Sequence, residues 1–343
     1  MSARVLSADP VVTASVYADR SLDRAIHEVV APALERLRAS QPQAGWAAWW
    51  VRYSKHGDHL KVRLHGPAEG ADEARAILET EARRMFGALP PRDGSRPRVS
   101  NPGSPSIDPQ DDVTEDYPDR TLVWTEYRRS HVTFGARQLL GNDDYVARLC
   151  TCLAAGAAVA LANMALDGTG TTPAVVRQRA LLKAVLAGVA GAGFSAEERM
   201  EYLRYHRGWL VRFSVPDESR EADVLAGFER QRAGMRAAAD QVARVAAAHW
   251  STPPGGEDGT PDGRMRAAFG ELAAFAAPLR GDPGFLSDPF TDDVSFPFVF
   301  KGLHGAANQA GLNLLNEAFL YHLLLGDEAM PARTGVEAEA AHV

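Results

Sequence analysis

The chain has 343 residues, of which 45% are hydrophobic and 24% are charged, and its formal net charge is −7. This length and composition are ordinary for a globular protein with a large core, in one big domain or two smaller ones. An acidic chain is not expected to take bulk nucleic acid as its main partner, because such proteins normally carry a basic surplus.

The first 140 residues are expected to form an α+β half. Strands are indicated by alternating apolar residues, and helices by apolar stripes that recur every three or four residues. In chain order the expected elements are one or two strands over 3–17, a helix over 22–38 with Ser21 as its N-cap, a hairpin over 49–66, a helix over 71–86 and a strand over 121–128. Seven prolines between Pro90 and Pro118 mark a long connection. This order predicts a mainly antiparallel sheet with flanking helices.

From residue 141 the pattern is largely helical. The expected helices are 143–166, 173–192, 196–205, 218–250, 265–279 and 300–325, with a flexible connection over 251–263 and a long ordered loop over 281–300. We therefore predict a helical second half over 141–327 that completes a cleft, and a disordered tail over 328–343.

Export and membrane insertion are not expected. The start, MSARVLSADPVV, lacks the apolar stretch and cleavage site of a signal peptide. The most apolar stretch, 150–164, is shorter than the ~20 residues of a membrane span. Cys150 and Cys152 diverge around an expected helix, so we interpret them as buried, reduced thiols of a cytoplasmic protein. No zinc-type spacing or nucleotide-binding motif is present, and neither a metal nor a cofactor is expected.

The hairpin is the most informative segment. In its second strand Leu60, Val62 and Leu64 alternate with four ionisable residues, which a period of two places together on the other face: His59, Lys61, Arg63 and His65. Such a face suits an anionic or polar partner lying across it. The alternative is an amphipathic edge hairpin with a solvated face.

Three motifs in this order resemble the C-terminal, elimination-type domain of lantibiotic dehydratases. The hairpin, WVRY followed by HLKVRLHG, resembles the entry hairpin of that domain. His304, Asn308 and Gly311 resemble its H-x-x-x-N-R-x-G motif, with Gln309 in place of the arginine. The third motif falls in EYRRSHVTFGA, where Thr133 occupies the position of the eliminating arginine.

The resemblance implies an activity on a modified peptide. From the length we do not expect the larger domain of a full dehydratase, and Thr133 argues against elimination. Within this family the chain resembles the thiopeptide pyridine synthases, which are proteins of about this size, and the resemblance implies a reaction that needs no cofactor. Their implied reaction joins two dehydroalanines of a leader-bearing precursor in a formal 4+2 aza-cycloaddition. Loss of water and of the leader peptide then gives a pyridine and a macrocycle.

We expect a few polar groups to assist this reaction. His304 is the first candidate for proton transfer, because histidine titrates near neutral pH; the alternative is a histidine that packs or caps a helix. Asn308, one turn further on, is expected to orient a peptide amide. Ser287 and Ser295 are candidate donors to an iminol oxygen.

Candidate substrate-binding residues lie in both halves. Aromatic rings of the substrate are expected to stack on Trp124, Phe296 and Phe298, although phenylalanines in such a loop also serve as core anchors. The remaining candidates are Arg52, His59, Lys61, Arg63, His65 and Glu126. A basic patch for the acidic leader is expected to include Lys55, His56, Lys61, Arg63, Arg83, Arg84, Arg128 and Arg129. A free-standing elimination subunit and a non-catalytic leader-binding scaffold remain alternatives.

Overall fold

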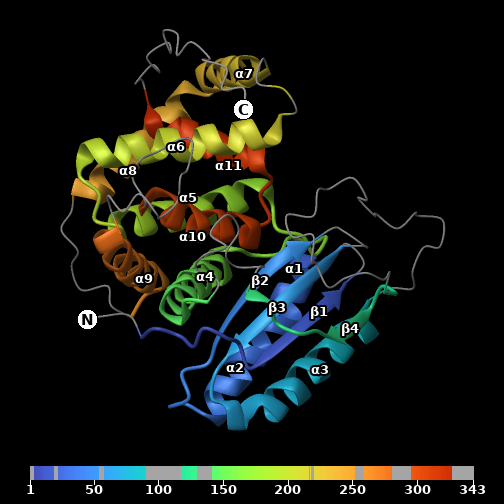
Figure 1. The fold of residues 1–343 in the computed structure, drawn as a ribbon. Coiled ribbons are helices and arrows are strands. Elements are labelled where there is room, and N and C mark those ends of the chain that lie inside the picture. The colour runs from blue at the N-terminus through green and yellow to red at the C-terminus, as the bar shows by residue number, and fades with distance from the viewer. Residues whose placement is uncertain are drawn as a thin grey trace, which may run out of the picture.

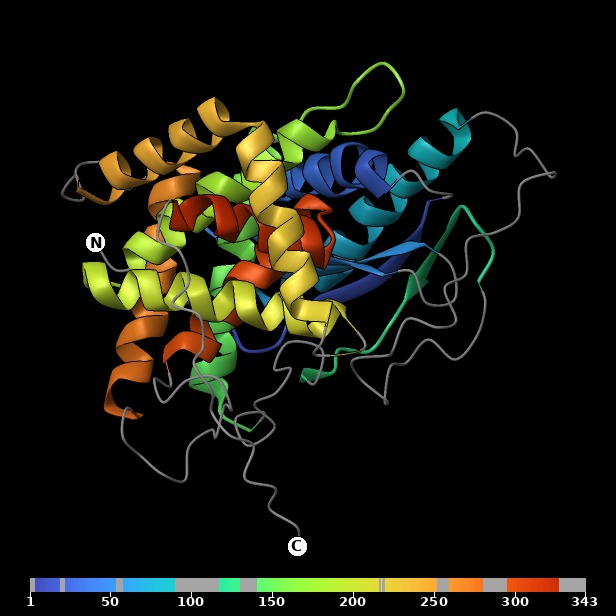
Figure 2. The same ribbon diagram turned by 90° about the horizontal axis from the view of Figure 1, so that it is seen from above.

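The computed structural model describes residues 4–18, 22–53, 58–89, 117–129, 141–215, 217, 220–251, 259–279 and 295–326. A small sheet with its helices forms one part of the molecule, and a layered group of helices forms the other (Figure 1). Seen from above, α10 (Ser295–Ala310) and α11 (Leu314–Leu325) lie within the helical part (Figure 2). All described strands precede residue 125, which confirms the predicted α+β order of a sheet followed by helices.

Four antiparallel strands make up the described sheet, in the order β2-β3-β1-β4. Their bounds are β1 Val12–Tyr17, β2 Ala47–Tyr53, β3 His59–His65 and β4 Thr121–Trp124. The predicted hairpin is β2–β3, with Trp50 opposite Val62. Because β1 also pairs with β3, the second strand of the hairpin lies inside the sheet rather than at its edge.

The ionisable face of β3 is covered. His59, Lys61, Arg63 and His65 are each no more than 3% exposed, so the solvated face considered from the sequence is wrong. Two of these groups pack against aromatic rings. The His59 ring stacks on Tyr17, and the Arg63 guanidinium lies 4.5 Å from a ring centre of Trp49. Cation–π contacts of this kind partly offset the cost of removing a cation from water.

Helices complete the α+β half. The predicted helix over 22–38 is continuous but changes pitch, because the π-turn η1 separates two α-helical pieces. The segments are α1 Leu22–Ala25, η1 Ile26–Val30, α2 Ala31–Ser40, η2 Ala68–Gly70 and α3 Ala71–Ala88.

The second half contains eight α-helices among its described residues. They are α4 Asp143–Asn163, α5 Ala174–Gly191, α6 Ala196–Ser214, α7 Glu221–Gly234, α8 Arg236–Ser251, α9 Pro261–Ala276 (followed by the 3-10 turn η6, Ala277–Leu279), α10 Ser295–Ala310 and α11 Leu314–Leu325. The single helix predicted over 218–250 is divided into two helices, α7 and α8, which meet after Gly234. The helix predicted over 196–205 continues to Ser214.

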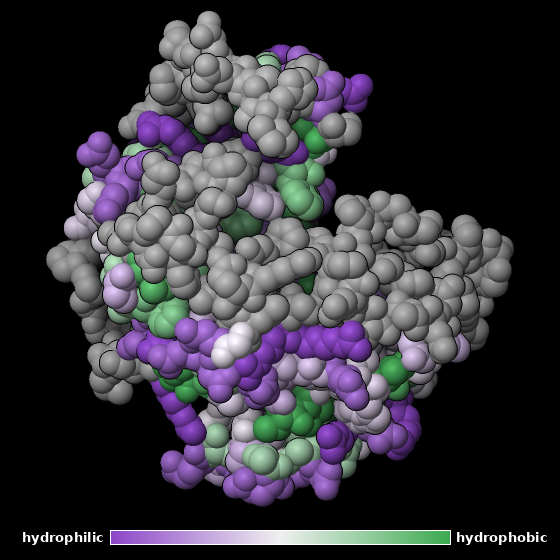
Figure 3. Space-filling view, in the orientation of Figure 1, coloured by the Kyte–Doolittle hydropathy of each residue, from purple (hydrophilic) through white to green (hydrophobic). Residues whose placement is uncertain are grey.

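α4 packs against α5, α9 and α10 of this half and against β2 of the sheet. Asn142 caps it by accepting a hydrogen bond from the Tyr145 amide at 3.0 Å. Of the described helices, only α4 is long and apolar enough to cross a membrane, but 72% of its apolar window is buried inside the protein, as in a core helix. Cys150 and Cys152 are buried, unbridged thiols, as predicted. Hydrophilic residues extend over both halves on the face shown in Figure 3.

The last two helices differ most from the prediction. The expected loop over 281–300 ends earlier, since α10 begins at Ser295, and the expected helix over 300–325 breaks at Gly311, where φ is 77°. The Gly311 amide donates to Asn308 and the Leu312 amide to Ala307, the hydrogen-bond pattern of a Schellman motif. This turn ends α10, and α11 then packs against α6.

Candidate functional site

One face of α10 carries three polar residues that are each intermediate in exposure, although the amine at the end of the Lys301 side chain is buried. Lys301, His304 and Asn308 are spaced by three and four residues, so they follow one another along the same side of the helix. Burial lowers the pKa of the Lys301 amine well below its usual range. The motif residues His304 and Asn308 therefore share a face, as expected from their spacing.

His304 is the outer member of a hydrogen-bonded chain across three helices. Its Nδ1 lies 2.8 Å from Oε2 of Glu317 on α11, and Oε1 of Glu317 lies 2.9 Å from Nε2 of His206 on α6. Nδ1 of His206 lies 2.7 Å from the hydroxyl of Tyr202. The side chain of His304 is 30% exposed, whereas Glu317 and His206 are buried.

The charges along this chain favour an ionised carboxylate between two imidazoles. Burial raises the pKa of Glu317, but the charge of His304 and the hydrogen bonds from both imidazoles outweigh it, and the pKa lies below its usual value. Burial lowers the pKa of His206, despite the opposing effect of Glu317. We therefore assign an anionic Glu317 and a neutral His206.

This geometry fixes the tautomer of His304. Because an ionised carboxylate only accepts hydrogen bonds, the Nδ1 of His304 carries a proton and donates it to Glu317. The Nε2 of neutral His304 is then an unprotonated acceptor, and it has no hydrogen-bond partner in the described part of the chain. A carboxylate, an imidazole and an accessible ring nitrogen form the arrangement by which enzymes orient a general base.

Asn308 holds the edge of the sheet. Its Oδ1 accepts a hydrogen bond from the Arg52 amide at 2.8 Å, and its Nδ2 donates to the Arg52 carbonyl at 3.3 Å. A primary amide can pair with a strand in this way because it offers one donor and one acceptor side by side. The contact closes the edge of β2 at this residue and fixes α10 against the sheet.

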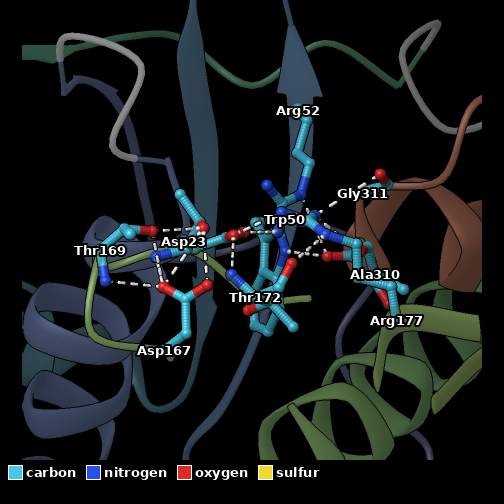
Figure 4. Close-up of polar contacts among 11 residues, drawn as sticks. Asp23, Trp50, Arg52, Asp167, Thr169, Thr172, Arg177, Ala310 and Gly311 are labelled. Atoms are coloured by element: carbon cyan, nitrogen blue, oxygen red, sulfur yellow. Dashed lines mark hydrogen bonds and ion pairs between the residues drawn. The ribbon is translucent and has the colours of Figure 1, made fainter. Parts of the chain in front are cut away.

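A buried ion cluster lies at the C-terminal end of α10 (Figure 4). The carboxylate of Asp23 accepts hydrogen bonds from Arg52 at 2.7 Å and from the Thr172 amide at 2.7 Å, and it pairs with Arg177. Arg52 also donates to the carbonyl of Gln309 and Arg177 to that of Ala310. Two cations thus meet the negative end of the α10 dipole.

Asp23 is held in its ionised form. Burial raises the pKa of this carboxyl group, but the charge of Arg52 and the hydrogen bonds from Thr172 and Arg52 outweigh it and bring the pKa below its usual value. The predicted substrate contact Arg52 is thus already engaged with protein groups, while one of its terminal nitrogens has no partner among the described residues.

Several predicted residues lie apart from this face. Phe296 and Phe298 are buried and pack against aromatic rings of Tyr202 and Tyr145, the arrangement expected of core anchors. Trp124 is 40% exposed, and Glu126 lies exposed just beyond β4. The positions Ser287, Thr133, Lys55 and His56 lie outside the described residues.

The expected basic patch is not a continuous unpaired surface. Lys61 and Arg63 are buried, and Arg83 pairs with Glu79. The other paired members are Arg84 with Glu81, and Arg129 with Asp9 and Asp143. Gln309, which replaces the motif arginine, donates to the Leu153 carbonyl in the core. Ser295 is buried at the start of α10.

Sequence reasoning missed Glu317, His206 and Tyr202. One signal for Glu317 exists, because it is the single acid in the otherwise apolar segment LLNEAFLYHLLL. A buried acid requires a partner, but its identity does not follow from the sequence. No group of three or more His, Cys, Asp or Glu side chains in the described ranges is arranged to hold a metal ion.

The comparisons with known proteins agree with this fold. Among solved structures, the protein is similar to the pyridine synthase TbtD from thiomuracin biosynthesis, with a TM-score of 0.56 and 16% identity over 92% of this chain and 96% of that chain. It is also similar to TsrL, with a TM-score of 0.51 and 14% identity over 91% and 92% of the two chains. At these identities the likeness is one of fold. No curated protein matches the sequence.

A family model gives the more specific result. The model described as "Lantibiotic biosynthesis dehydratase C-term" matches residues 12–327, nearly the whole chain, which confirms the resemblance seen in the motifs. The protein therefore belongs to the family of lantibiotic biosynthesis dehydratase C-terminal domains.

Proposed function

We propose that the protein is a cytoplasmic maturation enzyme for ribosomally synthesised peptides that forms the pyridine of a thiopeptide. It joins two dehydroalanines of a leader-bearing precursor in a formal 4+2 aza-cycloaddition, then eliminates water and the leader. Family membership supports a peptide substrate, and the fold shared with a pyridine synthase supports this reaction.

The observation that carries the proposal is the orientation of His304. The reaction requires an amide to become an iminol, so one group takes the N–H proton and another donates to the carbonyl oxygen. Nε2 of His304 is an accessible base, and its Nδ1 is held 2.8 Å from a buried carboxylate. The imidazolium formed can later protonate a leaving group. Such acid–base assistance contributes about 10²- to 10⁴-fold.

Positioning contributes the larger share. The two alkenes lie far apart in the peptide, and holding reacting groups together is worth ~7–11 kcal/mol. Asn308 and Arg52 keep α10 fixed against β2, so His304 is presented by a rigid helix. In this proposal Ser287 donates to the iminol oxygen, and exposed Trp124 and Glu126 contact the precursor.

The leader is proposed to bind the α+β half, apart from the reacting core. β4 pairs with β1 and with no second strand among those described, so an extended peptide can add beside it. Binding energy from this remote segment then positions the core. Free leader is expected to inhibit competitively; a leader that neither binds nor inhibits would contradict this division.

Mass spectrometry of a dehydrated, azole-bearing precursor tests the reaction. The proposal expects loss of water together with release of an amidated leader. Loss of glutamate from a glutamylated precursor instead identifies an elimination enzyme. Binding of the precursor by the protein without any change in the precursor's mass identifies a non-catalytic scaffold.

A further inference from the structure

Behind His304, the hydrogen-bonded chain contains two residues that the proposed reaction does not use. His206 is 0% exposed, and its ring stacks on that of Tyr321 with centroids 3.8 Å apart. Tyr202 is also 0% exposed. Buried polar side chains are costly unless each hydrogen bond is made, so a continuous chain of three such bonds calls for an explanation.

The proton on each bond follows from the donors available. Burial raises the pKa of Tyr202 well above its usual value, so its hydroxyl keeps its proton and donates to Nδ1 of His206. Neutral His206 then carries its proton on Nε2 and donates to Oε1 of Glu317. His304 donates to Oε2 of the same group. Every hydrogen bond in the chain therefore points towards Glu317.

Few other ionisable groups act on this chain. From α6 the carboxylate faces Tyr202 and His206, from α10 it faces His304, and from its own helix it faces Tyr321. α7 also packs against α11, but its Glu229 lies against His322, at 3.3 Å. In the described part of the protein, His206 is thus the one group besides His304 that donates a side-chain hydrogen bond to Glu317.

We propose that His206 and Tyr202 are positioning residues that set the basicity of His304. A carboxylate that accepts a second N–H is a weaker partner for an imidazolium, since part of its charge is already compensated. His206 therefore reduces the stabilisation that Glu317 gives to a protonated His304. Tyr202 keeps His206 in the tautomer that donates. This inference rests on the proposed role of His304 as the base.

Substitutions at His206 separate this role from packing. In His206→Leu the donor is lost, and the titration of His304, followed by NMR of its ring, is expected to move up by about one pH unit. The acidic limb of the activity profile is expected to move with it. In His206→Gln the side-chain amide donates in place of Nε2, so both titrations stay near those of the wild type.

Two further variants complete the test. His322→Leu removes another buried histidine, one that lies against Glu229 and Arg207, and is expected to leave the His304 titration unchanged. Tyr202→Phe is expected to shift it upwards by less than His206→Leu. If His206→Leu does not fold, as judged by circular dichroism, Tyr202→Phe and His206→Gln decide the matter.

The results separate the inference from the proposed function. An unshifted His304 titration in folded His206→Leu, or in Tyr202→Phe if the former does not fold, overturns the inference. The NMR titration needs no turnover. If His304 titrates as expected while His304→Asn remains fully active, the positioning inference stands and the proposed role of His304 fails.

Discussion

Two buried carboxylates hold α10, and each accepts hydrogen bonds from two basic side chains. Asp23, 4% exposed, lies between Arg52 and Arg177 at the C-terminal end of the helix. Glu317, 1% exposed, lies between His206 and His304. His304 is about two helical turns before the C-terminal end of α10. The two arrangements have the same form but different cations. A guanidinium keeps its proton at all relevant pH values, whereas an imidazole exchanges it near neutrality.

Exposure separates them further. His304 is 30% exposed, whereas Arg52 and Arg177 are 13% and 17% exposed and donate to backbone carbonyls as well as to Asp23. The Asp23 cluster therefore holds the two halves of the protein together, while the Glu317 chain presents a base. We expect the Asp23 cluster to hold α10 in the position from which this helix presents His304.

Breaking the Asp23 cluster is expected to give the largest effect. Asp23→Ala leaves two arginines without their carboxylate, and removal of one partner of a buried pair typically costs about 3–5 kcal/mol of unfolding free energy. Urea denaturation measures this. The control is Asp72→Ala, since Asp72 is 97% exposed in its pair with Arg75 and is expected to change stability by less than about 1 kcal/mol. Equal effects of the two changes would remove the structural role assigned to Asp23.

Removing the imidazole from the second cluster is expected to affect rate rather than folding. His304→Asn should slow turnover by about 10²-fold or more, because no base remains at this position, with precursor affinity kept. Single-turnover rates and direct binding measure the two quantities. His249→Asn, in a histidine on α8 that contacts Arg266, serves as the control and should remain active. A loss of binding equal to the loss of rate would make His304 a substrate contact instead.

Gly311 tests how the turn between α10 and α11 serves both clusters. The backbone φ of Gly311 is 77°, a value that residues with a side chain rarely adopt. A Cβ added there would also lie 2.9 Å from Cζ of Arg52. Gly311→Ala is expected to cost about 1–3 kcal/mol, from backbone strain and displaced arginines. The control Gly208→Ala, in α6 with nothing within 4 Å, should be neutral or slightly stabilising. Thermal unfolding compares them.

Substrate binding by the ionisable residues of β3 stays a prediction. The structure adds a second prediction for this strand, which concerns the pH dependence of stability. Burial and the charge of Arg63 lower the pKa of His65 to about 4, from 6.5. The unfolded chain then takes up the proton first, so the stability from neutral His65 is complete above pH 6.5 and falls as the pH drops towards 4. The expected loss is about 1 kcal/mol between pH 7.5 and 5.5. His65→Gln should reduce this slope; an unchanged slope would exclude His65 as its source.

The sequence predicts what depends on local pattern. Alternation in β3 correctly separates Leu60 and Val62 from Lys61 and Arg63, and helical spacing places His304 and Asn308 on one face. Burial of the Lys61 face could not be predicted, because alternation shows which side chains share a face but not whether a further layer covers it. His206 and Glu317 are 111 residues apart, and only the packing of α6 against α11 brings them together.

The central claim is that Glu317 orients His304 as the base. It is tested most directly by single-turnover conversion of a dehydrated precursor by the wild type and by Glu317→Gln, followed by mass spectrometry with precursor affinity measured in parallel. Glutamine fits the same space but cannot stabilise an imidazolium by charge. The expected result is a rate reduced by about 10²-fold or more at unchanged affinity. A folded Glu317→Gln protein that converts the precursor at the wild-type rate would contradict the claim.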